Sequence, residues 1–440
     1  MSGHLLAHGV GSREDLPIPL SYAVSGAAVA LLVSFLALVL LWREPRLQAA
    51  TAGWTVPRPV QRVLDARSVR AALRVAGVVA SAYVVMAAVF GRDDALNPTA
   101  GSVFVLLWIG VPLLSVLVGP VWRLVSPVRA LHWALCKVMR ISPADGVSRY
   151  PRRLGYWPAA LTLLAFVWLE LVAPENTSLR VLRTFFAAYV AVHLLAAGYW
   201  GSRWFGRGDG FEVFSALAGR LSPLGRRGDG RLVVRDPLSG IAGTPIAPGL
   251  FAVVGVLLGS TAYDSFSASP WWARQLQDSP VSPRLLETAT LVAAAVVVTG
   301  LFAGAAALSG RGAGLPARCA VGEFAHTLVP LVLGYVVAHY WSLLVIIGQQ
   351  TVIQLSDPLG TGADWLGIGD RAIDPTLAQP TLVAVLQVCS VVVGHVLGVV
   401  LAHDRAVALL PRRHALIGQL PLLVAMVAYT VAGLSLLFAA

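Results

Sequence analysis

The sequence has too little charge for a protein that folds in water. Of its 440 residues only 12% are Asp, Glu, Lys or Arg, while 57% are hydrophobic and the mean hydropathy is +0.74. A soluble domain carries about 25% charged residues, because its surface must be solvated. The shortage excludes a disordered chain and a soluble dinucleotide-binding enzyme. The sequence therefore predicts a polytopic membrane protein whose main partner is the lipid bilayer.

Cysteine and lysine are also scarce. The three cysteines, Cys136, Cys319 and Cys389, are scattered, so they predict neither a disulfide framework nor a Cys-x-x-Cys metal motif. Lys137 is the only lysine among 33 basic residues. The net charge is +11, but the bases gather in the loops of one membrane face, as topology and anionic lipid headgroups require. We therefore expect no nucleic acid among the partners.

Several catalytic motifs are absent. The chain contains no His-Glu-x-x-His, no Gly-x-x-x-x-Gly-Lys phosphate loop, no Gly-x-Ser-x-Gly elbow and no dinucleotide fingerprint. These absences argue against ATP hydrolysis, zincin-type proteolysis and α/β-hydrolase chemistry. The chemistry must then be sought among residues that are unusual for a membrane helix.

Ten apolar runs are long enough to cross a bilayer, since about 20 mostly apolar residues span roughly 30 Å of hydrocarbon. Clusters of charge, proline or glycine bound each run. The sequence predicts an all-α transmembrane bundle that forms a single integral membrane domain over residues 1–440. The predicted spans are 20–42, 72–90, 102–124, 156–173, 181–200, 249–267, 286–308, 321–347, 380–402 and 416–438.

The distribution of arginine orients these spans. If the loop after the first span is cytoplasmic, all but seven of the 33 bases lie on the cytoplasmic face. This asymmetry predicts that both termini are extracytoplasmic. The seven exceptions are Arg13, Arg92, Arg180, Arg183, Arg274, Arg284 and Arg371.

Three loops have features of their own. Two cytoplasmic loops, 125–155 and 201–248, each hold a short amphipathic stretch, Val128–Arg140 and Phe211–Leu221, which predicts helices lying in the membrane interface. The outer loop 349–380 is the most acidic part of the chain. Its carboxylates would suit calcium or magnesium, but their spacing matches no calcium loop, and a solvated lid is the simpler interpretation. The carboxylates are Asp357, Asp364, Asp370 and Asp374.

Ionisable side chains near the outer ends of the spans form the first candidate site. A charge at mid-bilayer costs about 2.5–3.5 kcal/mol on insertion scales, so such residues face the bundle interior. Glu170, Asp264 and His339 fall in this group, and His8 lies on the same face. The hydroxyl-rich run 259–265 around Asp264 predicts a wet cavity. Together these residues would bind a divalent metal ion and polarise a water molecule, or else the carboxylates would pair with nearby arginines.

A second group lies near the inner face. Glu323 and His326 have the Glu-x-x-His spacing of metal-binding helix bundles, and His395 and His403 lie on the next span. These four residues predict an alternative metal site or a proton acceptor. Glu323 and His403 lie at helix ends, where long polar side chains also reach the interface without a function. His193 is interpreted as a packing histidine.

Six segments of the chain carry a family resemblance. They resemble multi-pass bacterial membrane proteins of the fenitrothion hydrolase family, a group common in actinobacteria. The resemblance implies hydrolysis of an aryl phosphorothioate ester by a membrane protein that can act with further membrane subunits. His8, Glu170, Asp264 and His339 all fall inside the matching segments. The segments are 7–19, Trp157-Pro-Ala-Ala, Phe166-Val-Trp-Leu-Glu-Leu-Val-Ala-Pro174, Gly259-Ser-Thr-Ala-Tyr-Asp-Ser-Phe266, Val337-Ala-His-Tyr340 and Asp357-Pro-Leu-Gly360.

Three functions remain open at this point. The first is metal-dependent hydrolysis of a small organophosphate-type ester at an outward-facing intramembrane site, with Asp264, His339 and Glu170 as catalytic residues and His8 completing the metal ligands. The second is a proton-coupled transporter, because His403, His395, His326 and His339 form an axial series across the membrane. The third is a haem- or metal-binding redox or assembly partner that uses the same histidines.

Overall fold

The computed structural model describes residues 16–48, 50–411 and 417–438. The structure is 72% helical, and its strands form one small sheet. Among these residues, nine helical segments are long and apolar enough to cross a membrane, and α8 (Trp157–Leu171) is a shorter apolar helix. The chain is an all-α polytopic membrane protein, which confirms the predicted fold class.

The chain folds into two compact units. Among the described residues, the first unit comprises Gly53–Arg235 and Leu343–Pro375, and the second comprises 16–52, Asp236–Ser342 and 376–438. Glu170 therefore belongs to the first unit, whereas Asp264 and His339 belong to the second.

The first unit is built on the second to fifth predicted spans and the loops that follow them. A π-helical segment, Ser102–Gly110, joins α4 to α5, so that these pieces make one span. The helices of this unit are α2 (Arg58–Leu64), α3 (Arg67–Phe90), α4 (Pro98–Gly101), α5 (Val111–Val118), α6 (Trp122–Val125), α7 (Pro127–Val138), α8, α9 (Leu179–Trp200), α10 (Phe205–Gly208) and α11 (Gly210–Ala218).

The third span ends earlier than hydropathy alone predicts. The predicted run reaches residue 124, but α5 ends at Val118. Gly119 has a φ of 95°, a backbone conformation that side-chain-bearing residues rarely adopt, and Pro120 cannot donate a helical hydrogen bond. The apolar residues beyond this break form the separate helix α6.

Contacts between loops show which loops share an end of the first unit. β1 (Trp54–Thr55), β3 (Leu232–Val234) and β2 (Leu224–Arg226) form an antiparallel sheet in the order β1-β3-β2, which joins two predicted cytoplasmic loops. At two predicted outer loops, the Leu179 amide donates to Asp93 Oδ1 over 3.1 Å. Two helical passes, α4–α5 and α8, separate Asp93 from Leu179 in the sequence. These two passes together return the chain to the end that it left, although α8 has only 15 residues.

α11 differs from the interfacial helix that the sequence predicts. Every residue of α11 except Ala216 is buried. Phe211 packs edge-on against Phe166 of α8, with ring centroids 4.9 Å apart. Glu212, on the polar side, forms a two-pronged ion pair with Arg129 of α7, at 2.6 and 2.8 Å. The polar face is therefore neutralised inside the unit instead of being solvated at a membrane surface.

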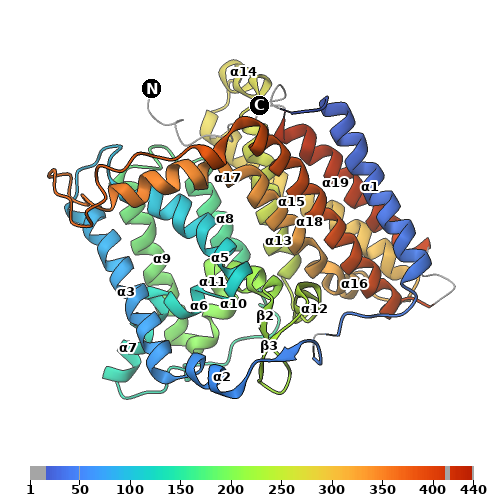
Figure 1. Ribbon diagram of the computed structural model, residues 1–440, viewed down its shortest axis with the longest axis horizontal. Helices are drawn as coiled ribbons and strands as arrows, with labels where there is room; N and C mark the ends of the chain where they lie inside the picture. Colours follow the sequence, from blue (N-terminus) through green and yellow to red (C-terminus); the bar gives the residue numbers. More distant parts are fainter. Residues whose placement is uncertain (1–15, 49, 412–416, 439–440) are drawn as a thin grey trace. The chain divides into compact units, whose positions relative to one another are not determined.

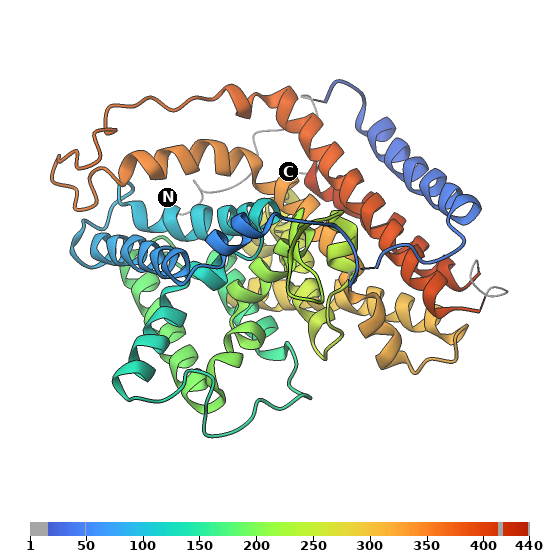
Figure 2. The same cartoon turned by 60° about the horizontal axis from the view of Figure 1, so that its bottom comes forward.

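The second unit is a bundle of long helices. α1, α18 and α19 lie side by side along much of their length, as the views in Figures 1 and 2 both show. The helices of this unit are α1 (Leu20–Leu41), α12 (Pro237–Ala242), α13 (Leu250–Ser267), α14 (Pro270–Asp278), α15 (Pro283–Arg311), α16 (Ala317–Phe324), α17 (Val329–Gln354) as far as Ser342, α18 (Pro380–Leu409) and α19 (Leu420–Leu437).

Glycines bring the central helices of the second unit into close contact. A Cβ on Gly259 of α13 would collide with the backbone of Ala295 on α15. A Cβ on Gly334 of α17 would lie 2.5 Å from the Ser390 carbonyl oxygen of α18. Small residues commonly allow such approach between membrane helices. These two contacts fix the helices that carry Asp264 and His339.

Candidate functional site

Asp264 and His339 meet inside the second unit. Asp264 lies on α13 and His339 on α17, and both residues are 6% exposed. His339 Nε2 lies 2.6 Å from Asp264 Oδ2, and the Tyr340 hydroxyl donates to the same oxygen over 3.3 Å. The predicted pair is therefore assembled, with a direct contact between its two side chains.

Ser265 adds a third group to this pair. Its Oγ lies 3.4 Å from His339 Nδ1. An ionised carboxylate can only accept hydrogen bonds, so the ring proton resides on Nε2 and Nδ1 keeps its lone pair. The lone pair then faces the Ser265 hydroxyl. Serine, imidazole and carboxylate thus form a continuous chain, the arrangement that activates a serine nucleophile.

The hydroxyl-rich run around Asp264 does not form the wet cavity that the sequence predicts. Ser260 Oγ and Thr261 Oγ1 both donate to the Leu257 carbonyl of their own helix, over 3.1 and 2.9 Å. Because these hydroxyls are satisfied by backbone, they need no water.

A cavity of about 400 Å³ opens beside this chain of residues. Its wall is formed by α13, α15, α17 and α19 of the second unit, and Ser265 is one of the lining residues. The volume falls within the roughly 300–1,000 Å³ typical of small-molecule sites. The cavity gives Ser265 a neighbouring space that a substrate can occupy.

Of the other two members of the predicted outer site, one belongs to the first unit and one is not described. Glu170 lies in the first unit, where the Asn176 side-chain amide donates to its backbone carbonyl over 2.5 Å. His8 lies outside the described residues. Within the part of the chain that the structure describes, no three His, Cys, Asp or Glu residues lie close enough to hold a metal ion.

The predicted inner cluster is divided among separate contacts. Glu323 forms an ion pair with Arg405 of α18. His395 Nδ1 lies 2.8 Å from the Val391 carbonyl of its own helix. His326 is buried in the 3₁₀ turn Ala325–Leu328 that links α16 to α17. Glu323 and His395 each contact a partner outside the predicted cluster. Within the described residues, the predicted inner cluster does not form a group that could hold a metal ion.

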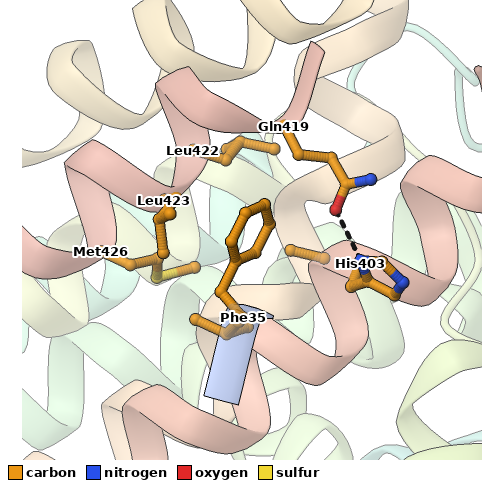
Figure 3. A pocket seen from close by; sticks show the side chains of 8 residues that line it. Phe35, His403, Gln419, Leu422, Leu423 and Met426 are labelled. Carbon is orange, nitrogen blue, oxygen red and sulfur yellow. Dashed lines mark hydrogen bonds between the residues drawn. The ribbon is translucent and has the colours of Figure 1, made fainter. Parts of the chain in front are cut away.

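His403, the fourth member, is held from two sides. Its Nδ1 lies 2.8 Å from Gln419 Oε1 (Figure 3), and its Nε2 lies 2.9 Å from the Trp42 carbonyl oxygen. The void beside Phe35 and Met426 measures only about 10 Å³, which is the space of a single water molecule. His403 therefore joins α1, α18 and α19 structurally.

Sequence reasoning missed a buried acidic group in the first unit. Asp209, in the predicted cytoplasmic loop 201–248, is fully buried and accepts a hydrogen bond from the Tyr189 hydroxyl at 2.5 Å. Burial raises the pKa of the Asp209 carboxyl, although the bond from Tyr189 opposes that change. His193 Nε2 lies 4.0 Å away. The available signal was the position of Asp209 as the N-cap of α11, where its side chain accepts from the Glu212 amide.

Comparisons with protein-family profiles, curated proteins and solved structures find no match to this chain. The resemblance to fenitrothion hydrolases therefore stays a prediction from the sequence. The functional argument rests on the geometry of the second unit.

Proposed function

We propose that the protein is an intramembrane hydrolase in which Ser265 is the nucleophile, His339 the general base and Asp264 the group that orients and stabilises the imidazole. The observation that supports this proposal is the chain Ser265 Oγ, His339 Nδ1, His339 Nε2 and Asp264 Oδ2, with separations of 3.4 and 2.6 Å. Serine–imidazole–carboxylate chains occur on unrelated folds. Here the serine lies at Nδ1 and the carboxylate at Nε2, which reverses the use of the two ring nitrogens in the Ser-His-Asp triad.

The positions of the hydroxyl and imidazole protons determine the role of each of the three residues. Ser265 Oγ attacks the electrophilic carbon or phosphorus of an ester while His339 Nδ1 takes its proton. The Asp264 carboxylate stabilises the imidazolium that results, because it accepts from Nε2 throughout. The imidazolium then gives its proton to the departing alcohol or phenol. Water, activated by the same imidazole, releases the product from Ser265.

Metal-assisted hydrolysis, the route expected from the sequence, shares Asp264 and His339 with this proposal and differs at Ser265. Metal chemistry would use the carboxylate and imidazole as ligands, and no step would require the serine hydroxyl. The expected proton-coupled transport is a further alternative. His395 and His403, which that alternative needs, are already engaged by Val391, Gln419 and Trp42. Of the three alternatives, serine hydrolysis is the one that gives a role to both contacts of His339, with Ser265 and with Asp264.

Ester hydrolysis by the purified full chain in lipid nanodiscs tests this proposal. We expect Ser265→Ala, His339→Gln and Asp264→Asn each to lower kcat by on the order of 10³-fold or more, because triad members act as a unit. Ser260→Ala is the matched control, since Ser260 is a buried serine on the same helix whose hydroxyl bonds to backbone. Full turnover by Ser265→Ala would overturn the proposal, and loss of that turnover on chelation would favour the metal route.

A further inference from the structure

The two threonine hydroxyls in the wall of the cavity beside Ser265 are bonded to backbone. Thr261 donates to Leu257 and Thr290 to Leu286, over 2.9 and 2.8 Å. Among the described residues that line it, none is charged or a histidine. A substrate with a sugar, phosphate or charged body would lose its hydration here without gaining partners, which is costly. The cavity wall therefore favours a substrate whose main part is apolar.

Two of the three tyrosines that line the cavity, Tyr335 and Tyr429, follow the same pattern. Tyr335 donates to the Tyr429 carbonyl over 2.9 Å, and Tyr429 donates to the Val298 carbonyl over 2.6 Å. Both hydroxyls tie neighbouring helices together, so they present ring carbons to the space. Ser265 differs from these hydroxyls, because its Oγ lies next to the His339 imidazole. A ligand in this cavity thus lies beside Ser265 on a largely apolar surface.

The cavity also reaches the surface of the membrane helices. On α15, Val297 and Leu301 are lining residues whose side chains are 56% and 57% exposed. Ala432, on α19, lines the cavity and is exposed as well. Both helices are apolar enough to span the bilayer, and exposed apolar side chains on such helices contact hydrocarbon. The opening between α15 and α19 therefore faces lipid.

We infer that the substrate is a long-chain carboxylic ester dissolved in the bilayer, and that its acyl chain enters between α15 and α19 and occupies this cavity. This inference rests on the proposed function. An acyl chain is chosen because it already resides in hydrocarbon, requires no hydrogen bonds and places its carbonyl at the one reactive end. The cavity accounts for binding, and the Ser265 chain accounts for cleavage.

The reaction balances with water as the only co-reactant. Ser265 Oγ bonds to the carbonyl carbon, the bond from that carbon to the alcohol oxygen breaks, and the alcohol leaves with the proton held by His339. A water molecule then attacks the acyl-Ser265 ester. The products are the fatty acid and the alcohol, and Ser265 recovers its proton.

Chain-length selectivity tests the inference in the full-length protein. Hydrolysis of p-nitrophenyl palmitate and p-nitrophenyl butyrate is compared in lipid nanodiscs for Ala432→Phe, Ala293→Phe and the control Ala428→Phe. Ala293 and Ala432 line the cavity, whereas Ala428 is exposed on α19 and does not. We expect each cavity variant to lower palmitate kcat/KM at least about tenfold, as displacing two buried methylene groups would. The control should keep wild-type rates on both esters, and each cavity variant should lower palmitate hydrolysis more than butyrate hydrolysis.

Equal rates on palmitate and butyrate in all variants, with both still dependent on Ser265, would overturn the inference and leave the proposed function standing. Preference for a short aryl phosphorothioate over the palmitate ester would also overturn the inference and leave the proposed function standing. Absence of Ser265-dependent hydrolysis would overturn the proposed function. Binding is then tested separately in Ser265→Ala with a palmitate that carries a diazirine at its chain end. Crosslinking to α15 or α19 that Ala432→Phe abolishes supports the cavity assignment, and unchanged crosslinking contradicts it.

Discussion

Asp404 is a buried carboxylate near the end of α18 that holds the segment after α1. Its Oδ1 accepts from the Trp42 indole over 2.9 Å and from the Arg46 and Leu47 amides over 2.6 and 3.3 Å. The neighbouring His403 contacts the Trp42 carbonyl, so adjacent side chains of α18 satisfy a donor and an acceptor of the same residue. One carboxylate oxygen thus fixes the end of a span.

Removing this carboxylate should destabilise the protein. Asp404→Ala leaves three donors without their acceptor, and an unsatisfied buried group costs about 1–3 kcal/mol. We expect the free energy of unfolding in detergent to fall by about that amount. Asp278→Ala is the matched control in the same unit, because Asp278 is exposed. Equal stability of Asp404→Ala and the control would contradict this role.

At the same scale, the sequence identified Asp264 and His339 because ionisable groups in membrane helices are expensive and therefore conspicuous. Ser265 was not distinguishable, since a serine in such a helix usually bonds to its own backbone, as Ser260 does. Asp404 escaped notice because it follows the predicted end of its span. Only the contacts between distant segments separate a structural polar residue from a reactive one.

The acidic segment after α17 is stabilised by its own backbone. Asp357 Oδ1 accepts from the Thr361 amide at 3.0 Å, and its Oδ2 accepts from the Gly362 amide at 2.7 Å. Asp364 Oδ1 accepts similarly from two amides, those of Ile368 and Gly369. These carboxylates organise turns within the predicted lid.

This segment should lose order in acid. The Thr361 amide and further backbone donors hold the pKa of the Asp357 carboxyl below its ordinary value. Because the folded pKa is depressed, the stabilisation is complete above the ordinary value and is lost as the pH falls through the depressed one. We expect full hydrogen-exchange protection of the Thr361 and Gly362 amides well above the ordinary Asp pKa of about 3.9, and its progressive loss as the pH falls below that value.

Asp357→Ala should remove this protection at neutral pH, while Asp370→Ala should leave it in place. Protection that persists in Asp357→Ala would show that other contacts order the turn.

Hydropathy predicts where the membrane helices lie better than it predicts the residues at which they end. Hydropathy located the spans, but it stopped the ninth at residue 402, whereas α18 continues to Leu409. The extension carries His403, Asp404 and Arg405, which are all paired inside the unit. Polar residues end a run of hydropathy without ending a helix when tertiary partners satisfy them. The break at Gly119 shows the opposite case, in which backbone conformation ends a helix within an apolar run.

For the whole molecule, the arginine asymmetry and the loop contacts make the same assignment of loops to ends within the first unit. The sheet joins two predicted cytoplasmic loops, and the Leu179–Asp93 bond joins two predicted outer loops. The division into two compact units had no counterpart in composition, because membrane spans of both units are equally apolar. Which loops share an end of the first unit could thus be predicted from the sequence, whereas the grouping of spans depends on packing.

The orientation of the chain is a prediction that labelling can check. In a background with Ser in place of the native cysteines, we introduce Gln277→Cys in a predicted outer loop and Asp229→Cys in a predicted cytoplasmic loop. Both positions are exposed. A membrane-impermeant maleimide added to intact cells should label Gln277→Cys and should label Asp229→Cys only after lysis. The reverse pattern would invert the topology.

The most direct test of the central claim is to locate a covalent adduct. The purified protein in nanodiscs is treated with a long-chain alkyl fluorophosphonate, which reacts with activated serines, and the modified peptide is identified by mass spectrometry. The account predicts one adduct at Ser265 that persists in Ser260→Ala and disappears in His339→Gln and Asp264→Asn. Modification of a different serine, or of Ser265 at an unchanged rate without His339, would contradict it.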